Sequence, residues 1–137
     1  SPGTYTGSMD VWDYETNESE YYFFDQDGAV IKPKDGWFSM KEYGRTSWYY
    51  IKNGEAVHHT WYNGYYFYAS GQMATGTMET LSGEIYVFDD NGYLLKNGWH
   101  ELDGVWYYTD AKGRAYTGER KINGKTYWFT DSGVWVK

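Results

Sequence analysis

Residues 98–113 read Gly-Trp-His-Glu-Leu-Asp-Gly-Val-Trp-Tyr-Tyr-Thr-Asp-Ala-Lys-Gly, and this stretch decides the fold. A Gly-Trp pair opens it, a polar turn follows around Gly104, three aromatic residues come next, and a second polar turn ends at Gly113. Short aromatic runs that are separated and closed by glycine turns are typical of a β-hairpin. The stretch therefore predicts a hairpin with a defined turn at each end.

The same pattern recurs along the chain. Each aromatic cluster ends at a glycine: 21–24 at Gly28, 48–51 at Gly54, 65–68 at Gly71, 85–88 at Gly92, 106–109 at Gly113 and 126–129 at Gly133. A hairpin alone is marginally stable, so each must pack on its neighbours, and the frequent glycines disfavour helix. We predict an all-β solenoid of about six stacked β-hairpin repeats of roughly 20 residues over 21–137. Residues 1–20 are predicted to be an N-terminal cap or a degenerate first unit.

The composition limits the kinds of core and partner. The chain has 17 Tyr, 8 Trp and 6 Phe, so burial must rely on rings, and it has no cysteine for a disulfide or a thiolate metal site. The net charge of −7 argues against nucleic acid, which needs clustered Lys and Arg. No apolar run is long enough to insert into a membrane. A cationic or neutral ligand fits this charge better.

Catalytic and metal sites are not predicted. Acidic turns such as 25–28 raise the alternative of a calcium loop, but none completes the oxygen ligands that such a loop requires. His58 and His59 are adjacent, and neighbours in a strand point to opposite faces, so the three histidines, with His100, do not form one site. We therefore predict a non-enzymatic protein without a cofactor.

The two faces of each hairpin differ in how much they vary. The second and fourth cluster positions are nearly constant: Tyr22/Phe24, Tyr49/Ile51, Tyr66/Tyr68, Tyr86/Phe88, Tyr107/Thr109 and Tyr127/Phe129. The first and third positions are aromatic in some units and not in others, as in Trp106/Tyr108 against Ile85/Val87. Because alternate side chains share a face, we predict that the constant face packs and the variable face binds. The alternative that both faces pack stays open.

These residues carry a resemblance to a known family. Gly98-Trp99 to Trp106-Tyr107-Tyr108, with Gly71-Gln72-Met73-Ala74-Thr75-Gly76, resembles the choline-binding, or cell-wall-binding, repeat of Gram-positive bacteria and their phages. The likeness covers about residues 21–137. This chain departs from the pattern at Thr77 and Glu119, which replace the tryptophan of the Gly-Trp pair. The methionine position is filled elsewhere by Val30, Ala56, Leu94, Ala115 and Trp135.

The resemblance implies stacked hairpins with choline held between consecutive units in cages of three aromatic residues, often with a methionine. Carried onto this sequence, it implies four cages: Trp99, Trp106 and Trp128; Trp37, Trp48 and Phe67; Trp12, Tyr21 and Tyr50; and one around Trp61, Tyr65 and Met73. It further implies a secreted protein at the cell wall or cell surface, attached by the choline of teichoic or lipoteichoic acid, with adhesion as one use.

Two other functions remain open. The glucan-binding repeats of streptococcal glucosyltransferases and the receptor-binding repeats of clostridial toxins are similar hairpin units, and flat rings stack on sugars as well as they surround a cation. A carbohydrate ligand is therefore the main alternative. A structural or adhesive role toward a host protein is the third.

Overall fold

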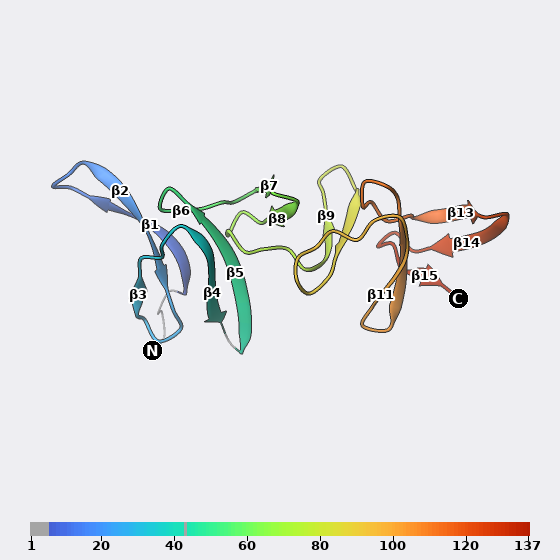
Figure 1. The fold of residues 1–137 in the computed structure, drawn as a ribbon, viewed down its shortest axis with the longest axis horizontal. Helices are drawn as coiled ribbons and strands as arrows, with labels where there is room; N and C mark the ends of the chain where they lie inside the picture. Colours follow the sequence, from blue (N-terminus) through green and yellow to red (C-terminus); the bar gives the residue numbers. More distant parts are fainter. Residues whose placement is uncertain (1–5, 43) are drawn as a thin grey trace. The chain divides into compact units, whose positions relative to one another are not determined.

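The computed structural model describes residues 6–42 and 44–137, which form strands and turns and no helix (Figure 1). The described strands form six small antiparallel sheets, each built on one hairpin. The all-β prediction and the number of hairpins are both confirmed. The first five residues of the predicted cap lie outside the described residues.

The chain divides into two compact units, residues 1–73 and 74–137. The first unit holds three sheets: β1 (Gly7–Asp13), β2 (Glu18–Phe24) and β3 (Val30–Ile31); β4 (Gly36–Glu42), β5 (Arg45–Lys52) and β6 (Glu55–Ala56); and β7 (Thr60–Tyr62) with β8 (Tyr65–Phe67). The second holds three more: β9 (Gly76–Glu79) and β10 (Ile85–Phe88); β11 (Gly98–Leu102) and β12 (Val105–Thr109); and β13 (Gly118–Ile122), β14 (Lys125–Phe129) and β15 (Trp135–Val136). Residues 7–24, which span most of the predicted cap, form the first hairpin.

The turns of the β7–β8, β11–β12 and β13–β14 hairpins each contain two consecutive residues with positive φ. Asp103 has φ 48° and Gly104 has φ 83° between β11 and β12, and Asn123-Gly124 repeats this between β13 and β14. Two consecutive left-handed residues form a type I′ turn, whose twist matches that of the paired strands. This turn sets the register in which Trp99 faces Tyr108 across the hairpin.

The closing turns that begin at Asp25, Asp89, Asp110 and Thr130 are each held by the side chain of that first residue. The Asp110 carboxylate accepts hydrogen bonds from the backbone N–H groups of Lys112 and Arg114, both at 2.9 Å. Gly113 follows with φ +85°, and a Cβ there would lie 2.6 Å from Cγ of Leu94. The predicted turn chemistry is confirmed, and Gly113 is required both by its backbone conformation and by this close contact.

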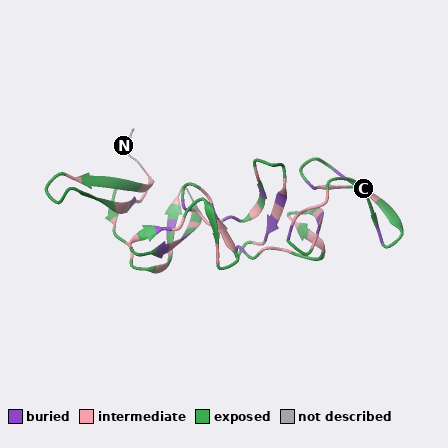
Figure 2. Cartoon of the chain, turned by 90° about the horizontal axis from the view of Figure 1, so that it is seen from above, coloured by how far each residue is buried: buried purple, intermediate pink, exposed green. Residues whose placement is uncertain are grey.

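The core of the first unit lies between its hairpins. The Phe23 ring is fully buried, 4.7 Å from the Tyr49 ring and 5.0 Å from the Phe38 ring of the next hairpin. The Tyr49 hydroxyl donates to Oε1 of Glu42 at 2.9 Å. Burial, and then the hydrogen bond to Glu42, raise the pKa of Tyr49. Figure 2 shows that buried positions occupy short parts of the chain while the hairpin tips are exposed.

The predicted faces hold for the best-preserved hairpin and need correction elsewhere. Tyr107 and Thr109 are buried, whereas Trp106 and Tyr108 are half-buried, as predicted. Phe23 holds a third position and is nevertheless buried, because this face of one hairpin packs against the second-and-fourth face of the next. Both faces therefore pack, and ligand access is limited to gaps between hairpins.

The register of the cluster at 65–68 also differs from the prediction. Phe67 pairs with Thr60, as Phe129 pairs with Gly118. Phe67 therefore holds the fourth position and Tyr65 the second, one residue away from the predicted assignment. The unit is shorter here, and strand pairing, not the order of aromatic residues, sets the faces.

Candidate aromatic ligand site

The second unit contains an open cavity walled by aromatic side chains. Trp99, Trp106, Tyr127 and Trp135 line it, and its volume is about 340 Å³. Trp99 and Trp106 come from the β11–β12 hairpin, while Tyr127 and Trp135 come from β14 and β15 of the next hairpin. All four side chains are half-buried, so the site lies at the junction of two consecutive repeats.

The rings stand at steep angles to one another. The centroid of Trp99 lies 6.5 Å from that of Trp106, 5.0 Å from that of Tyr127 and 5.4 Å from that of Trp135. The corresponding interplanar angles are 76°, 67° and 63°. In edge-to-face contacts the rings do not cover one another's faces as they would in a parallel stack. Ring faces therefore stay available to a ligand.

Trp99 is supported by two further rings. Tyr108, its partner across the hairpin, lies 5.2 Å away, and the buried Phe129 of the next hairpin lies 5.8 Å away. These contacts fix the orientation of Trp99 before any ligand arrives. A preorganised ring loses little conformational entropy on binding.

Two lysine ammonium groups lie over rings of the site. Lys125 places its ammonium 5.5 Å from the centroid of Tyr127, and Lys137 places its own 5.9 Å from that of Trp135. The faces of Tyr127 and Trp135 therefore accept a cation, and a cationic ligand would compete with these two lysines for them.

The first unit repeats this cluster around Trp37. The Trp37 centroid lies 6.3 Å from that of Trp48, 5.0 Å from that of Tyr65 and 6.0 Å from that of Phe67. Met73 pairs with Phe67 in the way that Trp135 pairs with Phe129, so it takes the place of Trp135. The two units therefore carry the same arrangement of side chains, with Met73 as the one difference in type.

The third ring of the principal cage was predicted to be Trp128, and the structure places Tyr127 there instead. Trp128 is 55% exposed and lies on the opposite face of β14, because adjacent residues of a strand point to opposite faces. Sequence reasoning also left out Trp135, although its position in the repeat, where the family has methionine, was a usable signal. Trp99 and Trp106 are brought together as predicted.

The structure differs more from the other three predicted cages than from the first. In the second, Trp37 and Trp48 meet, but Phe67 is fully buried and Tyr65 takes the accessible place. In the third, Gly7 pairs with Phe24, so Ser8 is the counterpart of Trp99 and Trp12 lies farther along the hairpin, 6.4 Å from Tyr14.

The other members of these cages lie apart. Tyr21 packs on Phe23, whereas Tyr50 packs on Trp37 and Tyr62. In the fourth cage, Trp61 contacts Tyr66, the neighbour of Tyr65 on the other face of the strand. The rings of the third and fourth predicted cages therefore belong to different junctions.

The described residues contain no group of three or more His, Asp or Glu side chains that could hold a metal ion. They also contain no helix long and apolar enough to span a bilayer.

Comparisons with known proteins agree with this geometry. Residues 97–115 and 120–134 match the family described as putative cell wall binding repeat. The chain is 28% identical over 150 residues to glucosyltransferase-S of Streptococcus mutans and 36% identical over 135 residues to glucosyltransferase-S of Streptococcus downei. These alignments cover 90% and 89% of this chain but 10% of each relative, so the chain spans about a tenth of their length.

Solved structures show the same fold. Choline binding protein F of Streptococcus pneumoniae aligns with a TM-score of 0.60 and 26% identity, over 98% of this chain and 52% of that one. The same protein in the presence of a peptidoglycan analogue aligns with a TM-score of 0.61. Two of the hairpin repeats of this chain thus match the cell-wall-binding repeat, and the predicted resemblance to the choline-binding repeat family is confirmed.

Proposed function

We propose that this chain is a binding module that attaches to the surface of a Gram-positive bacterium by holding the choline groups of a wall polymer. The observation that carries this proposal is the cavity formed by Trp99, Trp106, Tyr127 and Trp135 at a repeat junction. A choline-bearing teichoic acid is the partner that fits best. The location that follows is outside the cell, at the wall.

Elementary chemistry supports a quaternary ammonium as the ligand. Its nitrogen has no N–H donor, so ring faces recognise it, and each cation–π contact contributes roughly 0.5 to 2 kcal/mol. Three or four such contacts, less the cost of ordering the ligand, correspond to an affinity of roughly millimolar. A polymer that presents many choline groups turns weak sites into firm attachment.

The relatives support the same proposal. The solved protein with 26% identity is named choline binding protein F, and the alignment covers almost the whole of this chain. The segments that match the family, 97–115 and 120–134, contain Trp99, Trp106 and Tyr127, three of the four residues that line the cavity.

Choline titration of three proteins tests the proposal. In the wild type, we expect millimolar choline to shift the indole N–H resonances of Trp99 and Trp106. Trp99→Ala removes the central wall and should abolish these shifts at Trp106. Trp128→Ala is the matched control, because it removes a tryptophan from the same unit outside the cavity, and its choline affinity should stay within about twofold of the wild type. Loss of binding in Trp128→Ala but not in Trp99→Ala would contradict the proposed site.

Carbohydrate is the second candidate, because the curated relatives are glucosyltransferases and the alignments span about nine-tenths of this chain. Aromatic faces of the Trp37 and Trp99 clusters are wide enough to stack on sugar rings. Glucose oligomers titrated beside choline separate the two candidates. A response of the Trp99 indole to the oligomers, with none to choline, would assign the site to carbohydrate.

A further inference from the structure

Basic side chains surround the rings that the last hairpin contributes to the aromatic site. Lys125 lies two residues before Tyr127 in β14 and therefore shares its face of the sheet. Arg120 lies directly opposite Tyr127 in the register, on the same face. Lys137 follows β15 and places its ammonium over Trp135. One side of the aromatic site thus carries three positive charges.

These charges are not neutralised within their own sheet. The single acidic residue of β13, β14 and β15 is Glu119, which pairs with Trp128 and so lies on the other face. Within residues 6–42 and 44–137, neither Lys125 nor Lys137 forms an ion pair. Unpaired basic groups around a cavity attract an anion.

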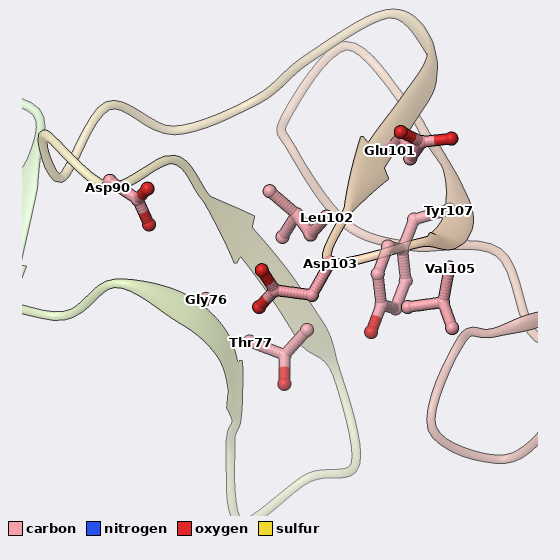
Figure 3. A pocket seen from close by; sticks show the side chains of 8 residues that line it. All are labelled: Gly76, Thr77, Asp90, Glu101, Leu102, Asp103, Val105 and Tyr107. Carbon is pink, nitrogen blue, oxygen red and sulfur yellow. The ribbon is translucent and has the colours of Figure 1, made fainter.

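The preceding cavity of the same unit, between the β9–β10 and β11–β12 hairpins, has the opposite charge. Figure 3 shows the carboxylates of Asp90, Glu101 and Asp103 among the side chains that line it, and the described lining includes no lysine or arginine. Glu101 is the cross-strand partner of Trp106, yet it belongs to this lining and not to that of the aromatic site. An anion is therefore attracted to the aromatic site and repelled from its neighbour.

The aromatic cluster of the first unit lacks the basic groups of the β13–β14 hairpin. There Tyr62 lies opposite Tyr65, in the place where Arg120 lies opposite Tyr127. The β7–β8 hairpin turns directly after this pair, so it has no strand position equivalent to Lys125. The shorter hairpin therefore keeps the rings and loses the charges.

One lysine does lie over a ring of the first unit. The Lys52 ammonium is 5.3 Å from the centroid of Tyr62. Unlike Lys125, it has an acidic residue, Glu55, directly opposite in the register. Its charge is thus balanced by the neighbouring strand. The two aromatic clusters resemble each other in their rings and differ in the charge that a ligand meets.

We propose that the aromatic site of the second unit binds both charges of a choline phosphodiester: the rings hold the quaternary ammonium, and Lys125 and Lys137 hold the phosphate. Only a short carbon chain joins the nitrogen to the phosphate ester, so the phosphate must lie close to the rings, where the flexible lysine side chains can reach it. Phosphate oxygens accept charge-assisted hydrogen bonds from the lysine ammonium groups. This inference rests on the proposed function and narrows its ligand from choline to the phosphodiester.

Competition for the ring faces explains why the phosphate matters at this site. Choline alone must displace the ammonium groups of Lys125 and Lys137 from Tyr127 and Trp135 and offers them no other partner. A phosphodiester displaces the same groups and supplies an anion for them. The first cluster has no such unbalanced lysines in its described sheets, so the phosphate should give no advantage there.

Titrations with choline, glycerophosphocholine and glycerophosphate separate the contributions of the two charges. The indole N–H resonances of Trp99 and Trp106 report on one cluster of the whole chain, and those of Trp37 and Trp48 report on the other. At low salt and neutral pH, we expect glycerophosphocholine to bind the Trp99 cluster about three- to tenfold more tightly than choline, as two exposed ion pairs allow. The Trp37 cluster should show no such gain, and glycerophosphate should shift neither pair of indoles.

The outcomes distinguish this inference from the function on which it rests. If choline shifts the indoles but glycerophosphocholine binds the Trp99 cluster no more tightly, only the role of the phosphate is overturned. An equal gain at both clusters would also overturn it, because the lysines would then not be the cause. Silence of all four indoles toward both choline compounds would overturn the proposed function itself.

Charge-removing variants test the two lysines. Lys125→Gln and Lys137→Gln should each lower the affinity for glycerophosphocholine about two- to fivefold, the loss of one exposed ion pair. Neither should lower the affinity for choline, because each removes a competitor for a ring face. Lys121→Gln is the matched control, since Lys121 pairs with Thr126 on the opposite face of the same hairpin. A variant of Lys125 that loses choline and glycerophosphocholine equally, or no more glycerophosphocholine than Lys121→Gln loses, would refute the phosphate contact.

Choline phosphodiesters occur in wall polymers and in lipid headgroups, and sedimentation distinguishes these sources. We expect the chain to stay in the supernatant with vesicles of phosphatidylcholine and to sediment with beads that carry glycerophosphocholine on a flexible linker. Sedimentation with the vesicles to the same extent as with the beads would overturn a wall polymer as the source of the phosphodiester.

Discussion

Two adjacent residues of β12 have opposite roles. Trp106 lines the aromatic site and is half-buried, whereas Tyr107 is 7% exposed and packs inside the unit. The difference follows from strand geometry, because successive side chains leave the backbone on opposite faces. Removing one ring should therefore affect binding, and removing the other should affect folding.

We predict that Trp106→Ala lowers choline affinity about three- to thirtyfold, the loss of one cation–π contact, with little change in the free energy of unfolding. Tyr107→Ala should instead reduce the free energy of unfolding by about 3 to 5 kcal/mol, as truncation of a large buried aromatic residue does. Urea denaturation followed by circular dichroism, together with choline titration, measures both quantities. If Trp106→Ala unfolds the protein while Tyr107→Ala leaves it folded, the assignment of the binding face and the packing face is the wrong way round.

At the scale of the element, the closing turn at 110–113 depends on one carboxylate. Burial raises the pKa of Asp110, but the backbone N–H groups of Arg114 and Lys112 and then the Arg114 guanidinium outweigh burial and hold the pKa below its ordinary value. A carboxyl with a lowered pKa stabilises the fold when ionised. The contribution of Asp110 is therefore present above the ordinary aspartate pKa of about 3.9 and is lost as the pH falls through the lower folded value.

We predict that Asp110→Asn reduces the free energy of unfolding by about 1 kcal/mol at pH 7. The difference from the wild type should shrink as the pH falls below about 4, because the wild-type carboxyl then becomes neutral as well. Thermal or urea unfolding at several pH values measures this. Asp131→Asn, in the exposed turn of the next hairpin, serves as a control that should show no such pH-dependent difference; a difference at Asp110 that is constant from pH 7 to pH 3 would refute the role of its charge.

At the scale of the whole molecule, each compact unit carries one aromatic cluster of the same design, around Trp37 in the first and Trp99 in the second. Each cluster alone gives weak attachment. Their joint effect on a polymer depends on both being occupied at once, since linked sites can exceed either affinity by about 10² to 10⁴.

We predict that Trp37→Ala and Trp99→Ala each lower retention on a surface dense in choline by at least about tenfold. For free choline, each variant should lose one of two independent sites and leave the affinity of the other unchanged. Surface plasmon resonance on choline-coated and bare surfaces, beside calorimetry with free choline, provides the comparison. If each variant lowers retention on the choline-coated surface no more than it lowers the binding of free choline, the two clusters act separately and multivalent attachment is contradicted.

Much of the hairpin could be predicted from local patterns. Asp103-Gly104 sets a type I′ turn, that turn sets the register, and the register places Trp99 and Trp106 on one face. All these relations lie within 16 residues of chain, so turn chemistry and alternation suffice. The cluster at 65–68 was misassigned because its unit is shorter and strand pairing alone shows its register.

The sequence by itself determined the repeating unit, its turns and the two tryptophans that one hairpin brings together. Only the tertiary structure decided that Tyr127 and Trp135 complete the aromatic site while Trp128 stays exposed. The physical reason is that a hairpin has two faces of similar composition. Which of them meets the neighbouring hairpin depends on packing between repeats, and no local rule of strand or turn specifies it.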